Sequence, residues 1–317
     1  MMLFSGSSNG KLAQAVANKL KTDLIPIETK KFASGEIYVR LTESARGGDC
    51  FVLQSHSGDL NSTIIEQVLI IDALKRASAK RITAVLPFYP YSRQDKKALP
   101  RESISARVMG DIFINAGADR LVSIDLHSQQ IQGFIEKPFD HLTAMPLFAV
   151  HFNKKFDGPL TVVSPDAGGV KRATVLAKRL KAYVAFVHKK RDPKVHNAVE
   201  ALTVIGEVEG RHAILIDDII DTAGTIAGAA HVLKDRGALS VSVVVTHGIF
   251  SPSSIERLEK APIKEIVVTD TLELNENAKK ISNIKVVSVA SIIGEALGSI
   301  FSDNSALGGA SFNASTR

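Results

Sequence analysis

Residues 213–226 read AILIDDIIDTAGTI, and this stretch decides the fold class of the chain. The continuous apolar run at 213–217 is typical of a parallel strand covered on both faces. It closes on two aspartates, and a short turn then leads into a helix predicted at about 225–235. In open α/β sheets, ligands collect beyond the carboxyl ends of the strands. The stretch therefore predicts a parallel α/β sheet with a binding site directly after this strand.

The turn after this strand combines groups that suit two parts of one ligand. A helix N-terminus offers N–H groups and partial positive charge, and Gly224 lets the backbone approach an anion closely. Thr222 and Thr225 add hydroxyl donors. The carboxylates of Asp217 and Asp218 repel phosphate, so we expect them to accept hydrogen bonds from sugar hydroxyls. A phosphate site beside hydroxyl acceptors predicts ribose 5-phosphate; the alternative is an acidic helix cap without a ligand.

Strand and helix patterns alternate along the rest of the chain. The run RITAVLPF at 81–88 predicts a second buried strand, and Thr63 with Glu66 predicts a capping box at the start of the preceding helix. This alternation predicts an α/β protein with two doubly wound parallel-sheet domains. We expect the domains at 1–145 and 146–296, with the segment from about 297 to 317 packing back on the first.

Composition and charge limit the classes of partner. The 317 residues are 45% apolar and 23% charged, with a net charge of +6. Residues 75–107 carry a net charge of +7 and residues 171–196 carry +8, which predicts an anionic ligand. The absence of tryptophan and of a basic tail argues against nucleic acid. The charges around 256–260 are interpreted as a solvated helix face.

Other features bear on the compartment. Cys50 is the one cysteine, so no internal disulfide forms, and we expect a buried free thiol in a reducing environment. No apolar run approaches the roughly 20 residues of a membrane-spanning helix. The first residues also lack a basic region followed by an apolar stretch. Together these features predict a cytoplasmic protein with no membrane partner.

Seven segments, in order along the chain, carry a resemblance to a known family. Besides 213–226, they are FASGE (32–36), YSRQDKK (91–97), DLH with QIQGF (125–134), SPDAGG (164–169), HKKR (188–191) and THGIFS (246–251). Together they resemble the ribose-phosphate diphosphokinases of the type I phosphoribosyltransferase superfamily, over about residues 3–300. The resemblance implies transfer of a diphosphoryl group from ATP to the C1 hydroxyl of ribose 5-phosphate, giving 5-phosphoribosyl 1-diphosphate and AMP.

The resemblance also implies a role for each matching residue. The ATP-binding residues are Phe32, Ser34, Gly35, Glu36, Arg93, Gln94, Asp95 and Arg101. Lys189 and Arg191 are the catalytic cations, and His127 and Asp166 hold Mg²⁺. The ribose-5-phosphate residues are Arg191, Asp217, Asp218, Asp221, Thr222, Ala223, Gly224 and Thr225. Ser44, Arg46 and Gln132 match a regulatory site, and the family implies a homo-oligomer, a hexamer, with a shared nucleotide pocket.

The residues themselves support a charge-neutralising mechanism. Neither GxxxxGK[ST] nor GxGxxG occurs, so arginines and Mg²⁺ must hold the triphosphate. Mg²⁺ prefers oxygen ligands, so substrate oxygens are expected to supply most of its coordination beside His127 and Asp166. The family's usual Asp-Asn appears here as Asp140-His141, which leaves the class of regulation open.

Three other functions compete with this interpretation. A phosphoribosyltransferase shares the motif at 217–225 but needs no second nucleotide domain. A non-catalytic regulatory homologue is expected to lose the cations of the HKKR segment or the metal positions, all of which remain in this sequence. A nucleic-acid-binding module is disfavoured by composition. No residue suggests itself as a general base.

Overall fold

The computed structural model describes residues 1–190 and 201–302, and the side chains of 189, 190 and 201 are left aside. These residues divide into two compact units. Unit 1 comprises Met1–Ala144, Thr271–Glu273 and the chain from Ser288 onward, and unit 2 comprises Met145–Asp270 and Leu274–Val287. Each unit is described by itself below.

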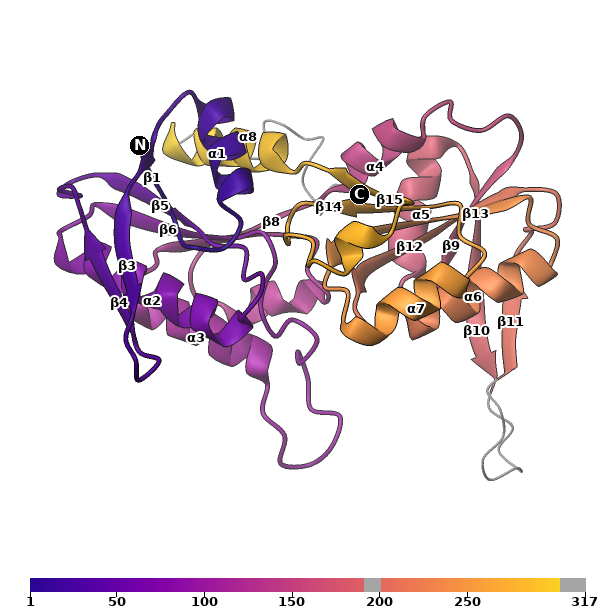
Figure 1. Ribbon diagram of the computed structural model, residues 1–317, viewed down its shortest axis with the longest axis horizontal. Helices are drawn as coiled ribbons and strands as arrows, with labels where there is room; N and C mark the ends of the chain where they lie inside the picture. The colour runs from indigo at the N-terminus through magenta and orange to yellow at the C-terminus, as the bar shows by residue number, and fades with distance from the viewer. Residues whose placement is uncertain (191–200, 303–317) are drawn as a thin grey trace. The chain divides into compact units, whose positions relative to one another are not determined.

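Unit 1 is built on a six-stranded parallel sheet with helices on both faces. Its strands are β1 (Met2–Ser5), β2 (Leu24–Ile25), β5 (Asp49–Leu53), β6 (Arg81–Leu86), β7 (Arg120–Ile124) and β8 (Phe139–Leu142), in the order β2-β1-β5-β6-β7-β8. Helices α1 (Gly10–Leu20) and α8 (Ala290–Phe301) cover one face, and α2 (Leu60–Arg76) and α3 (Ser105–Ala116) cover the other (Figure 1). The short η1 (Gln129–Phe134) follows β7.

Unit 2 has a seven-stranded sheet of the same kind. Its strands are β9 (Leu160–Ser164), β10 (Tyr183–Lys190), β11 (Ala201–Ile205), β12 (His212–Ile220), β13 (Ser240–Gly248), β14 (Glu265–Thr269) and β15 (Ile284–Val287). Helices α4 (Met145–Phe152) and α5 (Val170–Leu180) lie on one face, and α6 (Gly224–Asp235) and α7 (Pro252–Lys260) lie on the other (Figure 1). The short η2 (Ala278–Lys280) precedes β15. The predicted pair of doubly wound α/β sheets is confirmed.

The two units share one topology. The strand order of unit 2 is β11-β10-β9-β12-β13-β14-β15, and without β11 it matches the order of unit 1 strand for strand. In this match, β9 and β12 take the places of β1 and β5. In unit 2, Asp166 lies two residues after the end of β9, and Asp217 and Asp218 lie near the end of β12.

Antiparallel hairpins are the main departure from the predicted parallel pattern. Strands β3 (Ile27–Lys31) and β4 (Ile37–Leu41) form a separate two-stranded sheet in unit 1. In unit 2, β11 pairs antiparallel with β10 at the sheet edge. An antiparallel edge strand on an otherwise parallel sheet is common. Pairing with β11 carries β10 as far as Lys190.

The predicted N-cap of α2, Thr63, is wrong by four residues, because the N-cap is Asp59. The helix begins at Leu60, where the side chain of Asp59 accepts a hydrogen bond from the backbone N–H of Ser62 at 3.3 Å. Thr63 instead donates its hydroxyl to the carbonyl of Leu60. Glu66 does not return to the Thr63 backbone, because its carboxylate accepts hydrogen bonds from Ser7 and Gln54 in neighbouring loops. The capping-box spacing was therefore coincidental.

Helix α8 marks where unit 2 ends. The predicted second domain extends to residue 296, whereas unit 2 ends at Val287 and the whole of α8 belongs to unit 1. A Cβ atom added to Gly294 would lie 2.6 Å from the Lys19 side chain of α1, so the two helices approach closely. The tail beyond residue 302, predicted to pack back on the first domain, lies outside the described residues. No helix in the described ranges is long and apolar enough to cross a membrane.

Candidate functional site

The stretch after β12 forms an open turn at the start of α6. The strand continues through both aspartates to Ile220, three residues beyond its predicted end. Ala223 adopts the left-handed conformation with φ of 59°, and α6 begins at Gly224. Thr222, Gly224 and Thr225 are exposed, whereas Ala223 is buried. Because the first N–H groups of a helix have no intrahelical acceptor, this turn presents donors to solvent.

Residues from the segment after β13 brace the turn. The backbone N–H of Ser251 donates to the carbonyl of Asp221 at 3.1 Å, and the Ser251 hydroxyl donates to the Asp221 carboxylate. Arg257 of α7 donates from Nη1 to the carbonyl of Thr222 at 2.8 Å. Arg257 is exposed, as predicted for the charges at 256–260, but it also makes this contact with the turn. Ser251 and Arg257 therefore hold the turn in place while Gly224 and Thr225 stay exposed.

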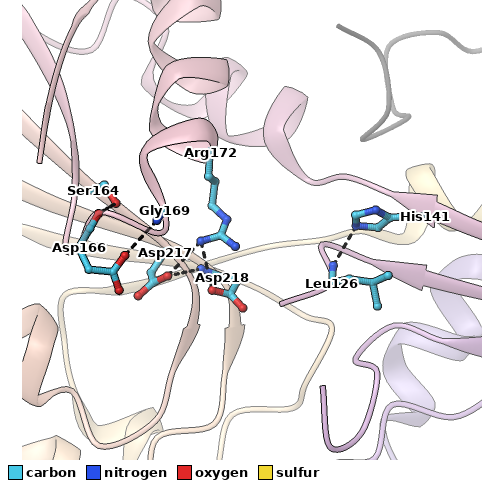
Figure 2. Close-up of polar contacts among 8 residues, drawn as sticks. All are labelled: Leu126, His141, Ser164, Asp166, Gly169, Arg172, Asp217 and Asp218. Atoms are coloured by element: carbon cyan, nitrogen blue, oxygen red, sulfur yellow. Dashed lines mark hydrogen bonds and ion pairs between the residues drawn. The ribbon is translucent and has the colours of Figure 1, made fainter. Parts of the chain in front are cut away.

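The aspartate pair is linked to helix α5 by one arginine. Nη1 of Arg172 lies 3.1 Å from Oδ1 of Asp217 and 3.1 Å from Oδ1 of Asp218, as Figure 2 shows. The backbone N–H of Asp218 also donates to Oδ1 of Asp217 at 2.9 Å. Burial and the neighbouring charge of Asp218 raise the pKa of Asp217, and Arg172 opposes them. The charge of Asp217 therefore depends on its burial, on Asp218 and on Arg172, and the carboxyl oxygens of the pair can accept hydrogen bonds.

Asp166 lies in the loop after β9, the strand that pairs with β12. Its Oδ1 atom accepts a hydrogen bond from the backbone N–H of Gly169 at 2.9 Å, and its carbonyl accepts the Ser164 hydroxyl at 2.6 Å (Figure 2). The side chain is exposed. The loop thus fixes the Asp166 carboxylate while leaving it accessible, so this residue can still bind a hard cation.

In unit 1, His127 follows β7 and is exposed. The residue at the end of that strand, Asp125, is buried, and its carboxylate accepts hydrogen bonds from the Thr143 hydroxyl at 2.7 Å and from the Ala144 backbone at 3.0 Å. The backbone N–H of Leu126 donates to Nε2 of His141 at 2.9 Å (Figure 2). Strand β8 therefore holds the segment that presents His127.

The predicted ATP residues fall on two parts of unit 1. Phe32, Ser34, Gly35 and Glu36 form the turn of the β3–β4 hairpin, where Phe32 is 54% exposed and packs edge-on against Tyr38. The Ser34 hydroxyl donates to the Glu36 carboxylate at 2.7 Å. Such an exposed aromatic ring is available to cover a base.

The other predicted ATP residues lie in the long connection from β6 to α3. Arg93 and Arg101 are exposed, and Arg101 has a left-handed backbone with φ of 72°. Gln94 accepts the Ser105 hydroxyl at 2.6 Å and anchors the loop to the start of α3. Asp95 is half-buried. Gln94 therefore fixes the loop that carries the guanidinium groups of Arg93 and Arg101.

The proposed catalytic cations lie at the edge of the described chain. The backbone of Lys189 belongs to β10 and pairs with Leu202 of β11. Arg191 lies outside the described residues. Of the residues matching a regulatory site, Ser44 and Arg46 are exposed, and the Gln132 amide donates to the Gln129 carbonyl at 3.1 Å and contacts His141 at 3.4 Å.

Comparisons with known proteins identify the family of the chain. Residues 1–117 match the N-terminal domain of ribose phosphate pyrophosphokinase, and residues 192–308 match the phosphoribosyl synthetase-associated domain. The chain is 51% identical to the ribose-phosphate pyrophosphokinase of Corynebacterium glutamicum, with 96% of this chain and 94% of that protein covered. The chain belongs to the ribose-phosphate pyrophosphokinase family.

Two further relatives extend the comparison. The ribose-phosphate pyrophosphokinase of Streptomyces avermitilis is 49% identical, over 96% of this chain and 94% of that protein. The crystal structure of phosphoribosylpyrophosphate synthetase from Mycobacterium smegmatis is 44% identical, with a TM-score of 0.90 over 96% of this chain and 99% of that one. The predicted family and enzyme class are confirmed.

A metal site built from protein side chains alone is not found in the described part of the chain. Within residues 1–190 and 201–302, no group of three or more His, Cys, Asp or Glu side chains is placed to hold a metal ion. Asp166 supplies the kind of oxygen ligand that Mg²⁺ prefers, whereas a His127 ligand would be unusual for this ion.

Sequence reasoning missed two residues of this pyrophosphokinase. Arg172 and Arg257 contact the segment at 217–222 through side chains that come from other helices. Arg172 counts toward the basic segment 171–196, which signalled an anionic ligand but not a contact with the aspartates. Arg257 carried no signal, because its partner is a backbone carbonyl 35 residues away.

Proposed function

We propose that this pyrophosphokinase transfers the diphosphoryl group of ATP to the C1 hydroxyl of ribose 5-phosphate. The observation that carries the proposal is the turn from β12 to α6. Acceptor carboxylates at the strand end and exposed helix N–H groups follow each other within nine residues. The C1 oxygen forms a bond to the β-phosphorus, the bond from that phosphorus to the bridging oxygen breaks, AMP leaves with this oxygen, and the hydroxyl proton is released.

The sugar phosphate is proposed to bind along this turn. The N–H groups of Gly224 and Thr225, with the hydroxyls of Thr222 and Thr225, bind the 5-phosphate at the N-terminus of α6. Asp217 and Asp218 accept hydrogen bonds from the ring hydroxyls, and Asp221 with Ala223 fixes the shape of the turn. Arg191 is proposed to contact the sugar phosphate as well.

The nucleotide is proposed to bind through unit 1. Phe32 covers the adenine while Ser34, Gly35 and Glu36 form hydrogen bonds at its edge. Arg93 and Arg101 bind phosphate oxygens with paired N–H groups, and Gln94 and Asp95 complete this loop. Lys189 and Arg191 are proposed to stabilise the transition state, since phosphoryl transfer depends mainly on positioning and charge neutralisation.

Mg²⁺ is the proposed metal. When bound, it would neutralise charge on the triphosphate and help orient it. Asp166 would hold it through a carboxylate oxygen, and His127 is proposed as a second protein ligand. The remaining coordination would come from phosphate oxygens and water.

Assembly and regulation are also proposed from the family. We expect a homo-oligomer, a hexamer, in which the nucleotide pocket around Phe32 is shared between subunits. Its exposed ring and the isolated β3–β4 hairpin are consistent with an intersubunit contact. Ser44, Arg46 and Gln132 are proposed to bind a regulatory phosphate or nucleotide, with His141 in contact with Gln132. The protein is expected in the cytoplasm.

Product analysis tests the proposed reaction. The protein is incubated with ATP, ribose 5-phosphate and Mg²⁺, and nucleotides and sugar phosphates are followed by ³¹P NMR. We expect AMP in equal amount with a new acid-labile sugar diphosphate. ADP in place of AMP would contradict the position of cleavage. Consumption of 5-phosphoribosyl 1-diphosphate with a nucleobase would instead indicate a phosphoribosyltransferase.

A further inference from the structure

Arg172 contacts both aspartates because helix α5 begins very close to strand β9. A Cβ atom added to Gly169, directly before the helix, would lie 2.5 Å from Oγ of Ser164. A glycine therefore lets the helix start here without a clash. Strands β9 and β12 pair in parallel, with Val163 opposite Leu215. The first turn of α5 thus lies beside the end of β12, where the aspartates are.

The contacts of Arg172 are concentrated on one nitrogen. Nη1 lies 3.1 Å from Oδ1 of Asp217 and from Oδ1 of Asp218 (Figure 2). The Arg172 side chain is 18% exposed, and the side chain of Asp218 is 4% exposed. Among residues 1–190 and 201–302, no further hydrogen bond of this guanidinium is found. Within these ranges, the polar contacts of Arg172 are therefore those with the two aspartates.

Two adjacent carboxylates with little exposure need a counter-charge. Without one, mutual repulsion and lost hydration favour protonation of one carboxyl group. A protonated carboxyl group has fewer acceptor sites for a hydroxyl than a carboxylate has. A cation in contact with both opposes this protonation and fixes where their oxygens lie. Arg172 and the backbone N–H of Asp218 both donate to the same atom of Asp217, Oδ1.

We propose that Arg172 is a positioning residue for ribose 5-phosphate, which orients Asp217 and Asp218 to accept the sugar hydroxyls. This inference rests on the proposed function of the two aspartates. Arg172 acts on the sugar through them, so its loss affects the affinity for ribose 5-phosphate and not the affinity for ATP. A guanidinium that merely stabilised the fold would not separate the two substrates in this way.

The test compares Arg172→Gln with Arg179→Gln. Both arginines lie in α5, but Arg179 is exposed in its last turn and contacts neither aspartate. Steady-state kinetics are measured for each substrate at saturation of the other. We expect R172Q to raise KM for ribose 5-phosphate at least tenfold, with KM for ATP and kcat within threefold of the wild type. R179Q should match the wild type in all three, and Arg172→Lys should recover part of the loss.

Two results would overturn the inference. One is a KM for ribose 5-phosphate in R172Q within twofold of the wild type, and the other is an equal rise of both KM values. If R172Q does not fold, judged by circular dichroism, R172K carries the test, with a rise of threefold or more expected for ribose 5-phosphate alone. A wild-type enzyme that makes no AMP would refute the proposed function itself, whereas an active wild type with an R172Q like R179Q would refute only the role of Arg172.

Discussion

Asp217 is the residue whose ionisation should be visible in the stability of the protein. Burial and the adjacent Asp218 charge raise its pKa to about 8, against an ordinary value of 3.8. The folded state therefore binds this proton more tightly than the unfolded state. The stabilising effect is complete below about pH 4 and is lost as the pH rises toward 8.

Asp217→Asn should remove this dependence. The variant keeps an oxygen that can accept the backbone N–H of Asp218 but carries no charge. We expect its free energy of unfolding at pH 8 to exceed that of the wild type by about 1 kcal/mol or more, since one pKa unit corresponds to about 1.4 kcal/mol. Urea unfolding at pH 4 and pH 8 measures the difference, which should shrink at pH 4. A constant difference at both pH values would exclude ionisation of Asp217 as its cause.

Single residues also show where sequence reasoning stops. The acidic pair and the threonines at 217–225 could be selected from the sequence because they are contiguous and follow an apolar run. Arg172 could not, because 45 residues separate it from Asp217 and only the pairing of β9 with β12 brings them together. A local pattern cannot show an ion pair that depends on sheet order.

At the scale of elements, helix α7 supports the phosphate-binding turn through Arg257. Arg257→Met keeps most of the apolar stem but removes the donor to the Thr222 carbonyl. A typical hydrogen bond contributes about 0.5–1.5 kcal/mol, so we expect KM for ribose 5-phosphate to rise about two- to tenfold. Lys260→Met on the same helix is the control, because its exposed pair with Glu256 contributes little. Equal KM values in the two variants would remove Arg257 from the support of the turn.

Elements differed in how well they could be predicted. Buried parallel strands such as β6, β12 and β14 are continuous apolar runs, so their positions follow from the sequence. The β3–β4 hairpin has half-exposed strands and charged residues, and no apolar run marked it. The predicted start of α2 was wrong because Asp59 and Thr63 both suit an N-cap, and tertiary contacts of Glu66 decided between them.

At the scale of the whole molecule, unit 1 depends on helix α8, which follows the whole of unit 2 in the sequence. Leu297 of α8 is fully buried, and its helix packs against α1. We expect Leu297→Ala to lower the free energy of unfolding by about 2–5 kcal/mol. Glu295→Ala should cost less than about 1 kcal/mol, because its pair with Lys19 is half-exposed. Guanidinium unfolding compares the two, and equal losses would show that α8 does not belong to the core of unit 1.

The division into two units followed from length and from the repeated alternation of strands and helices. The end of the second unit did not, because α8 resembles any other amphipathic helix and only its contacts with α1 assign it. The shared strand order of the units was also hidden, since their sequences show no repeat at a fixed period. The two units thus share a strand order without a repeated sequence.

The most direct measurement of the central claim is a crystal structure of the protein with ribose 5-phosphate. We expect the phosphate within hydrogen-bond distance of the backbone nitrogens of Gly224 and Thr225. At least one ring hydroxyl should then donate to Asp217 or Asp218. A sugar phosphate bound elsewhere, with the turn after β12 unoccupied at saturating ligand, would contradict the account.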